Sequence, residues 1–367
     1  MPLLIFAMPW VYGNKLASLA RLLAVSVSNA LIDYLPVTSM ELYLFRHETY
    51  RSLYNCSYLS DEEWWARGKP DVIYGISLLL IVSLFTILYI PCLIVIYRSK
   101  LFEYAGYKLM FYVGLIDVNA LLMSSGFTGY YTIIGAMPCP HMDLSYFISL
   151  IGNFNWASQS TSVIILALNR CVELWKPSYI TNTFEGRRTY FWIGASILYS
   201  MYYLWFGTGL LYNSAAGHNW YPSPYYRVEG LEHIDYKPYV SLVFLYHDIV
   251  TGVLLIILYS FLVGSIWWKG RLAGGSLSKI QTLISIQSFC LCCCIVTVVV
   301  IYALMWLVEI SKTGAKIASV VWQISNGISF QNIILKLEFR CTSHHVSTTE
   351  QKHPRRRRGI VQKTKEN

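Results

Sequence analysis

The chain alternates long, nearly uncharged apolar stretches with short charged segments. Seven stretches reach the about 20 residues that a helix needs to cross a bilayer. They lie at residues 72–97, 109–135, 144–175, 190–213, 239–266, 280–308 and 317–337. None shows the residue-by-residue alternation of outer-membrane strands. The pattern therefore predicts an all-α membrane protein with a bundle of seven transmembrane helices.

The distribution of Lys and Arg predicts how such a bundle is oriented. If the N-terminus lies outside, the inner segments carry 19 of the 29 Lys and Arg residues. This excess follows the positive-inside rule, so we expect the N-terminus outside and the C-terminus inside. Residues 1–71 then form an outer region, residues 72–340 the bundle, and residues 341–367 a basic inner tail.

Composition narrows the functional classes. Charged residues make up only 13% of the chain, about half of what soluble domains carry. The net charge of +9 lies mainly in short loops and the tail beside apolar segments, which favours a lipid bilayer over nucleic acid as the partner. For Arg355–Arg358 in the tail, a solvated chain and a lipid-binding patch both remain open.

Two further features concern the outer side. Asn55-Cys56-Ser57 is the one N-x-[ST] triplet of the chain, which makes Asn55 a candidate glycosylation site. Cys56 and Cys139 are the only cysteines that this topology places outside, so we expect them to form a disulfide. Four crowded cysteines in the sixth span, Cys290 and Cys292–Cys294, spread around a helix and suit packing better than a metal.

Several stretches carry a family resemblance. They are "LYNCSYLSDEEWWARGKP" (53–70), "LYIPCL" (88–93), "YKLMFYVGLIDV" (107–118), "TGYYTIIGAMPC" (128–139) and "LALNRCVELWKP" (166–177). Together they resemble the serpentine receptor class T family of nematode chemoreceptors. The resemblance implies a G-protein-coupled chemosensory receptor in the plasma membrane of a sensory neuron. It further implies a small external ligand bound in the bundle and a heterotrimeric G protein as partner.

The resemblance also implies roles for residues at the inner end. Asn169-Arg170-Cys171 stands where rhodopsin-like receptors have their D/E-R-Y triplet, so Asn169 and Arg170 are expected to act in a signalling switch. For Arg170 the alternative is an interfacial charge that snorkels to water. The seventh segment lacks the N-P-x-x-Y motif, and the outer loop 214–238 lacks the cysteine of the usual bridge.

Asp117 is the most conspicuous site residue, because a carboxylate inside a membrane span needs polar partners. We expect it to face Ser158, Ser162 or Asn326 as part of the switch. A Na⁺ site and a purely structural hydrogen-bond anchor are both open. Candidates for the ligand pocket are Asn153, Trp156, Gln159, His247 and Asp248, although buried amides and histidines also join helices to one another.

The ends of the chain raise separate hypotheses. Cys341 follows a short amphipathic stretch and is a palmitoylation candidate. Residues 1–39 lack the family's character, and Leu22–Ile32 is too short to span a bilayer. An over-extended translation start, a cleaved signal and an amphipathic leader compete here. The first is favoured, because the receptor-like sequence is complete from Met40.

Other functional classes fit less well. A retinal protein needs a lysine inside the seventh span, and a membrane hydrolase needs clustered metal ligands. Neither pattern is seen, so no enzyme activity, metal or cofactor is expected. A seven-span ligand-gated channel subunit and a non-signalling membrane scaffold remain the alternatives to a receptor.

Overall fold

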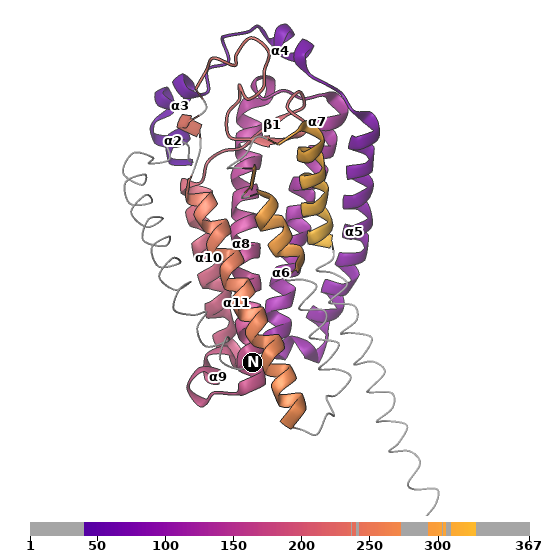
Figure 1. Ribbon diagram of the computed structural model, residues 1–367, viewed down its shortest axis with the longest axis vertical. Helices are drawn as coiled ribbons and strands as arrows, with labels where there is room; N and C mark the ends of the chain where they lie inside the picture. Colours follow the sequence, from indigo (N-terminus) through magenta and orange to yellow (C-terminus); the bar gives the residue numbers. More distant parts are fainter. Residues whose placement is uncertain are drawn as a thin grey trace, which may run out of the picture.

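The computed structural model describes residues 40–235, 237–239, 242–272, 293–302, 304–305 and 310–327, which form an elongated helical bundle (Figure 1). Its long helices are α5 (Val72–Arg98), α6 (Ala105–Leu121), α8 (Met142–Trp175), α10 (Thr189–Phe206) and α11 (Leu242–Leu272). Two further helical segments cover Cys293–Tyr302 and residues 312–327. We call the end of the bundle that carries α2–α4 the cap end, and the opposite end the α9 end (Figure 1).

Three helices in the described ranges are long and apolar enough to cross a membrane, namely Val72–Arg98, Ala105–Ile134 and Val243–Arg271. The central helix α8 is long enough but too polar for the same criterion. It packs against α6, α10 and α11, and many of its polar side chains are buried among them. Its polar residues therefore face protein rather than lipid, as expected for the middle helix of a bundle.

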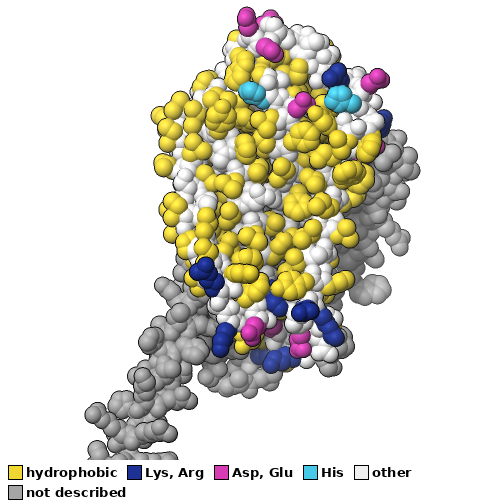
Figure 2. Space-filling view, turned by 180° about the vertical axis from the view of Figure 1, so that it is seen from behind, with side chains coloured by type: hydrophobic (Ala, Val, Ile, Leu, Met, Phe, Trp, Pro, Cys, Tyr) yellow, Lys and Arg dark blue, Asp and Glu magenta, His cyan; other side chains and the backbone are white. Residues whose placement is uncertain are grey.

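The outside of the bundle shows the complementary pattern. Large apolar side chains such as Ile73, Leu80 and Ile87 on α5 are exposed. Figure 2 shows a broad apolar belt between the two ends, with charged side chains confined to those ends. An apolar belt of this kind matches the hydrocarbon layer of a bilayer.

The second predicted span is a continuous helical segment with an irregular turn in it. The π-helical turn η2 (Leu122–Phe127) joins α6 to α7 (Thr128–Ile134). Such turns are often found at functional sites because they rotate the side chains that follow. Here the turn directs Ser124 toward the interior of the bundle, where its side chain is buried.

The predicted fourth and fifth spans differ from the observed helices at the cap end. α10 ends at Phe206 because Gly207 is extended, and residues 211–213 of the predicted span form strand β1 (Leu211–Asn213). β1 pairs antiparallel with β2 (Asn219–Tyr221), with Tyr212 opposite Trp220. α11 begins at Leu242 and follows the short 3-10 turn η5 (Lys237–Tyr239).

The short connections at the α9 end are helical as well. Lys100–Glu103 (η1) joins α5 to α6, while α9 (Ser178–Phe184) and Gly186–Arg188 (η4) join α8 to α10. Lys108 reaches from α6 to this connection and donates to the Gly186 carbonyl over 2.6 Å. The basic side chains of these connections gather at the α9 end, as the sequence pattern predicts for one side of the membrane.

Two glycines let α5 and α7 cross closely. A Cβ on Gly75 would lie 2.7 Å from the Gly129 carbonyl oxygen, and one on Gly129 would lie 3.0 Å from the Gly75 carbonyl oxygen. Helices in membranes associate through such small-residue contacts because backbone packing replaces the hydrophobic effect there. The contact fixes α7, and with it the π-turn, against α5.

A layer of short elements covers the cap end. It consists of α2 (Met40–Phe45), α3 (His47–Leu53), α4 (Asp61–Arg67), the 3-10 turn η3 (Cys139–His141) and the loop that contains β1 and β2. A capping box between Ser60 and Glu63 starts α4, and Trp64 is completely buried beneath it. A disulfide joins Cys56 to Cys139 with a Cα–Cα distance of 5.5 Å, the pairing that the sequence predicts.

Tyrosines hold the long loop against the N-terminal segment. Tyr225 donates to the carbonyl of Asn55 over 2.7 Å, and Tyr239 donates to that of Leu53 over 2.6 Å. Both rings belong to the apolar cluster that contains Trp64. Residues 40–71 are therefore packed on the bundle through the loop between α10 and α11.

An ion pair joins the start of α5, the first long helix, to the last described helix, residues 312–327. Lys316 Nζ lies 2.6 Å from Asp71 Oδ2, and Asp71 caps α5 by accepting from the backbone N–H of Tyr74. These two hydrogen bonds lower the pKa of Asp71. Close by, burial and the charge of Lys316 lower the pKa of His218 to about 4.

We expect acidification to destabilise the region around His218 at a higher pH than the one at which the Asp71 carboxylate becomes protonated. Because the folded pKa of His218 lies below the unfolded value of about 6.5, the unfolded chain binds more protons between those values. Stability should thus be full above about pH 6.5 and fall as the pH drops toward 4, lowering the melting temperature by a few degrees.

Melting curves of the purified protein between pH 7 and pH 4.5 measure this effect. We expect His218→Gln to flatten the pH dependence. His233→Gln, which changes an exposed histidine of the same loop, serves as the control and should leave it unchanged. An identical pH slope in the His218 variant would assign the effect to other groups.

Several sequence predictions lie outside the described residues. They include everything proposed for residues 1–39, for Cys341 and for the basic tail, as well as much of the predicted sixth span and the end of the seventh.

Candidate functional site

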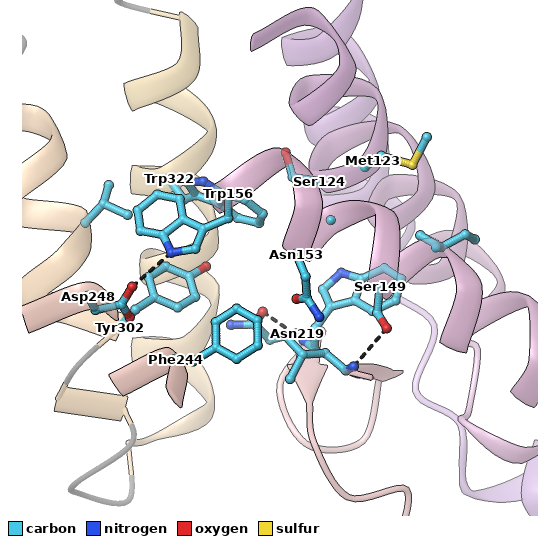
Figure 3. A pocket seen from close by; sticks show the side chains of 15 residues that line it. Met123, Ser124, Ser149, Asn153, Trp156, Asn219, Phe244, Asp248, Tyr302 and Trp322 are labelled. Carbon is cyan, nitrogen blue, oxygen red and sulfur yellow. Dashed lines mark hydrogen bonds between the residues drawn. The ribbon is translucent and has the colours of Figure 1, made fainter. Parts of the chain in front are cut away.

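A cavity opens between the helices on the inner side of the β1–β2 loop, away from the cap (Figure 3). It encloses about 820 Å³ of empty space, including the part open to solvent. Small-molecule sites in proteins are mainly apolar with a few polar groups, and the lining of this cavity has that character. The lining residues come from η2, α8, the β1–β2 loop, α11 and the two last described helical segments: Met123, Ser124, Ile148, Ser149, Gly152, Asn153, Trp156, Leu210, Asn219, Trp220, Phe244, Asp248, Val298, Tyr302 and Trp322.

Among the described residues that line this cavity, Asp248 on α11 is the one with a charged side chain. Its exposed fraction is only 3%, and its Oδ1 accepts a hydrogen bond of 2.9 Å from the indole N–H of Trp156. The bond joins α8 to α11 at the level of the cavity (Figure 3). Trp156 stands edge-to-face on Trp322, with ring centroids 6.4 Å apart, and Trp322 contacts Tyr302 in the same way.

Polar side chains also set the upper boundary of the cavity. Asn153 donates to the carbonyl of Thr208 over 2.8 Å, and the hydroxyl of Ser149 accepts from the N–H of Leu210. Trp220 donates through its indole N–H to Thr128 over 2.8 Å. These bonds hold the segment after α10 and strand β2 over the cavity, because their partners lie on α8 and α7.

Three polar atoms at the cavity have no hydrogen-bond partner among the described residues. They are Ser124 Oγ, the Tyr302 hydroxyl and Trp322 Nε1, all three buried. Buried polar groups are usually paired, so unpaired ones around a cavity are typical of groups that a ligand or water completes. The cavity therefore offers hydrogen-bond donors beside a single carboxylate.

A second polar cluster lies deeper in the bundle around Asp117. The carboxylate is completely buried and accepts from Tyr89 over 2.6 Å and from Gln159 over 2.5 Å. Gln159 also donates to the Asn326 side chain, and the Tyr89 hydroxyl oxygen lies 3.0 Å from the Asn326 backbone carbonyl oxygen, which shares its one proton. The cluster thus joins α5, α6, α8 and the helix 312–327, and both carboxylate oxygens accept from neutral donors.

The predicted partners of Asp117 are only partly found there. Asn326 belongs to the cluster, linked through Gln159 and Tyr89. Ser158 lies instead 2.6 Å from the hydroxyl of Tyr112, and the Ser162 hydroxyl donates to the Ser158 carbonyl. In the described ranges no group of three or more His, Cys, Asp or Glu side chains is arranged to hold a metal.

The predicted pocket residues separate into two groups. Asn153, Trp156 and Asp248 line the cavity, whereas Gln159 belongs to the Asp117 cluster. His247 is directed between α10 and α11, where its Nδ1 lies 2.9 Å from the Tyr199 hydroxyl. The last two therefore join helices to one another, the alternative that the sequence left open.

Arg170 lies at the α9 end of α8 and forms a local contact. Its Nη1 is 2.8 Å from Glu173 Oε2, one turn farther along the helix. The guanidinium covers Gly106 of α6, where an added Cβ would lie 3.1 Å from it. Asn169 is buried, with an Oδ1 that has no partner among the described residues. Nearby, Lys269 donates to the carbonyl of Leu174 over 2.6 Å and joins α8 to α11.

Sequence reasoning missed most of the cavity wall. Tyr302 stands in an apolar stretch without a polar neighbour that would mark it, Trp322 precedes Gln323 but belongs to no motif, and the β1–β2 loop carries no recognisable motif. Tyr89 lies within the stretch 88–93 that carries the family resemblance, and the sequence gives no other indication of its role.

Comparison with known proteins agrees with this architecture. Residues 39–351 match the model of the "Serpentine type 7TM GPCR chemoreceptor Srt" family. The chain belongs to this family. It is also similar to "Serpentine receptor class T-55" of Caenorhabditis elegans, with 26% identity over 301 residues, which cover 80% of this chain and 79% of that protein.

Family membership confirms the resemblance that the sequence motifs indicated and establishes a multi-pass membrane chemoreceptor type. The match covers every helix described above, from Met40 in α2 onward. It also includes the parts of the predicted sixth and seventh spans that lie outside the described residues.

Proposed function

We propose that this chain is a chemosensory receptor that binds a small external ligand in the Asp248 cavity and signals to a heterotrimeric G protein. The observation that carries the proposal is the cavity itself, which is aromatic-walled, lies within the bundle and has unpaired polar atoms. Family membership supports the receptor class. In this proposal the receptor lies in the plasma membrane of a sensory neuron, with its N-terminus outside the cell and its C-terminus inside.

In this proposal the two polar clusters act in sequence. A ligand in the cavity contacts Trp156 and Trp322, which stand above Gln159 and Asn326 on the same two helices. A shift of α8 against the helix 312–327 would strain the hydrogen bonds around Asp117. The opposite end of α8 carries Asn169 and Arg170, so the same movement reaches the end of the bundle where we place the G protein.

The proposed coupling role of Arg170 predicts a separation of signalling from folding. Arg170→Ala should reach the cell surface, because the lost Glu173 contact is a partly exposed ion pair of small energetic value. We expect ligand-evoked G-protein dissociation to fall by about tenfold or more. Surface labelling and a resonance-energy-transfer assay of the G protein, both in the same cells, measure the two quantities.

Two controls make this test specific. Arg187→Ala, in the same group of basic residues at the α9 end, should retain signalling. Glu173→Ala releases Arg170 from its ion pair and should keep or raise basal signalling. Equal responses of the Arg170 variant and the unchanged receptor, at matched surface levels, would make Arg170 a structural residue.

The proposed orientation predicts glycosylation of Asn55. The residue lies in the cap, and its side chain is partly exposed. Glycosidase treatment should shift the mobility of the expressed protein by about one N-linked glycan, and Asn55→Gln should abolish the shift. Asn213→Gln, which alters a buried asparagine outside any triplet, is the matched control. If a tag placed before residue 70 is accessible only in permeabilised cells, the orientation is reversed.

A further inference from the structure

We propose that the ligand of this cavity is a protonated amine on an aromatic or otherwise apolar body, with Asp248 as its counter-ion. The inference rests on the proposed function, since it assigns a chemical class to the ligand of the same site. Its basis is a charge balance that the described residues leave incomplete.

Among the described residues, no cationic side chain is paired with the carboxylate of Asp248. Trp156 is the one hydrogen-bond donor to it among the described residues, and no ion pair reaches it there. The sequence excludes a basic partner from several neighbouring spans, because residues 190–213, 280–308 and 317–335 contain neither Lys nor Arg. A buried carboxylate with one neutral donor is poorly compensated, and a bound cation would complete it.

The walls around Asp248 suit an organic cation better than a metal ion. Trp156, Tyr302 and Trp322 form a chain of edge-to-face rings beside the carboxylate, and Phe244 lies one turn before it on α11 (Figure 3). Aromatic faces attract ammonium groups through their quadrupole and also pack against apolar carbon. A metal ion would require several oxygen ligands, whereas the cavity offers one carboxylate among rings.

The rest of the cavity limits the shape of the amine. Met123, Ile148, Leu210 and Val298 provide apolar surface away from the carboxylate. The unpaired Tyr302 hydroxyl, Trp322 N–H and Ser124 hydroxyl can bond an oxygen on the ligand. An arylalkylamine, with a cationic nitrogen at one end and a ring at the other, therefore matches the cavity, and an added hydroxyl or ether oxygen would fit beside it.

A route from the cap end is also visible. A second cavity, lined among others by Tyr221, Tyr226 and Ile310, shares Leu210, Trp220 and Tyr302 with the first. The two cavities therefore meet at the side chains of Leu210, Trp220 and Tyr302. A small cation would pass from the outer cavity to the inner one by displacing one of these three side chains.

A cysteine introduced in the cavity can test the charge selectivity without a known ligand. Gly152 lines the cavity, one turn from Trp156, and an added Cβ would have no heavy atom within 4 Å. The full-length Gly152→Cys protein in lipid nanodiscs is treated with 2-aminoethyl or 2-sulfonatoethyl methanethiosulfonate. Each rate is divided by that of a free thiol, and labelling of the unchanged protein is subtracted.

We expect the cationic reagent to react at least about tenfold faster than the anionic one, because a charged cleft concentrates counter-ions. Asp248→Asn in the same background should reduce this ratio to about twofold or less. Asp143→Asn, which changes an exposed carboxylate at the cap end, should preserve it. Ser124→Cys repeats the test with a second reporter that lines the cavity.

Three results would overturn the proposal. The first is a cation preference that survives Asp248→Asn. The second is faster reaction of the anionic reagent. The third is that neither Gly152→Cys nor Ser124→Cys reacts with either reagent, since the cavity would then be closed to small cations. The measurement contains no G protein, so a receptor that fails to couple would leave it unaffected.

Binding of matched probes extends the test to ligands. Quenching of tryptophan fluorescence compares 2-phenylethylamine with 2-phenylethanol, and tryptamine with tryptophol. The amine of each pair should bind at least about tenfold more tightly, and Asp248→Asn should remove the difference. Amines that bind no better than their alcohols, undetectable binding included, contradict the assigned class. A receptor activated only by neutral compounds would keep the proposed function and exclude the amine.

Discussion

Replacing Asp117 with alanine is expected to lower the free energy of unfolding by about 2–4 kcal/mol. The substitution removes the acceptor of one buried Gln159 amide hydrogen and leaves the Tyr89 hydroxyl with its longer contact to the Asn326 carbonyl. An orphaned buried donor costs about 1–3 kcal/mol and a lost hydrogen bond about 1 kcal/mol, whereas hydrogen bonds between membrane helices average less, which sets the lower part of the range. The effect is large because the cluster joins four helical segments.

Thermal unfolding of the purified protein in nanodiscs measures the loss, and three variants locate its origin. Tyr89→Phe removes one donor together with its need for an acceptor and should cost less than Asp117→Ala. Asp117→Asn keeps one oxygen as acceptor but turns its amide nitrogen toward the other donor, so an intermediate loss is expected. Glu62→Ala changes an exposed carboxylate at the cap end and should shift the melting temperature little. Equal stability of Asp117→Ala and Glu62→Ala would show that the cluster is not a structural anchor.

The positions of the long helices could be read from the sequence because charge interrupts them so rarely. α5 and α8 begin and end within a few residues of the predicted spans. At one end of α8 the reason is local, since Lys176 adopts a left-handed conformation that ends the helix just before Pro177. Apolar length and the few breaking residues thus determine these elements together.

The end of α10 could not be predicted in the same way. Residues 207–213 are as uncharged as the helix before them, yet they leave it and form the roof of the cavity. What decides this is tertiary contact, because Asn153 and Ser149 on α8 bond Thr208 and Leu210. Gly207 and Gly209 weaken the helix locally, but no local pattern in residues 207–213 shows which side chains of α8 hold the segment.

The charged residues of the candidate site could be predicted from the sequence, but the side chains that surround them could not. Asp117 and Asp248 stood out because an ionisable residue inside a membrane span is rare and needs partners. The partners themselves, Tyr89 and Trp156, are aromatic residues in a chain that has 29 Tyr and 12 Trp, so residue type alone could not single them out. Their roles depend on which helix faces which, and the sequence does not encode that locally.

Removing the Cys56–Cys139 disulfide is expected to destabilise the cap by about 4 kcal/mol and to weaken ligand binding in the same variant. The bridge closes a chain segment with a sequence separation of 83, so its loss frees a long loop in the unfolded state. Cys56→Ser/Cys139→Ser should lower the melting temperature and reduce surface expression. Cys92→Ser, at a free thiol on α5, should change neither by a comparable amount.

The expected effect on binding follows from the contacts between the cap and the loop above the cavity. Asn55, the neighbour of Cys56, accepts a hydrogen bond from Tyr225 through its backbone carbonyl. Tyr225 belongs to the loop between α10 and α11, and Leu210 and Trp220 of that loop line the cavity. If the N-terminal segment loosens, these side chains lose the support that holds them above Asp248. We therefore expect the serine variant to lose the cation preference measured at Gly152→Cys while Trp156 and Asp248 remain in place. A destabilised variant that kept the full preference would show that the cap stabilises the fold but does not shape the cavity.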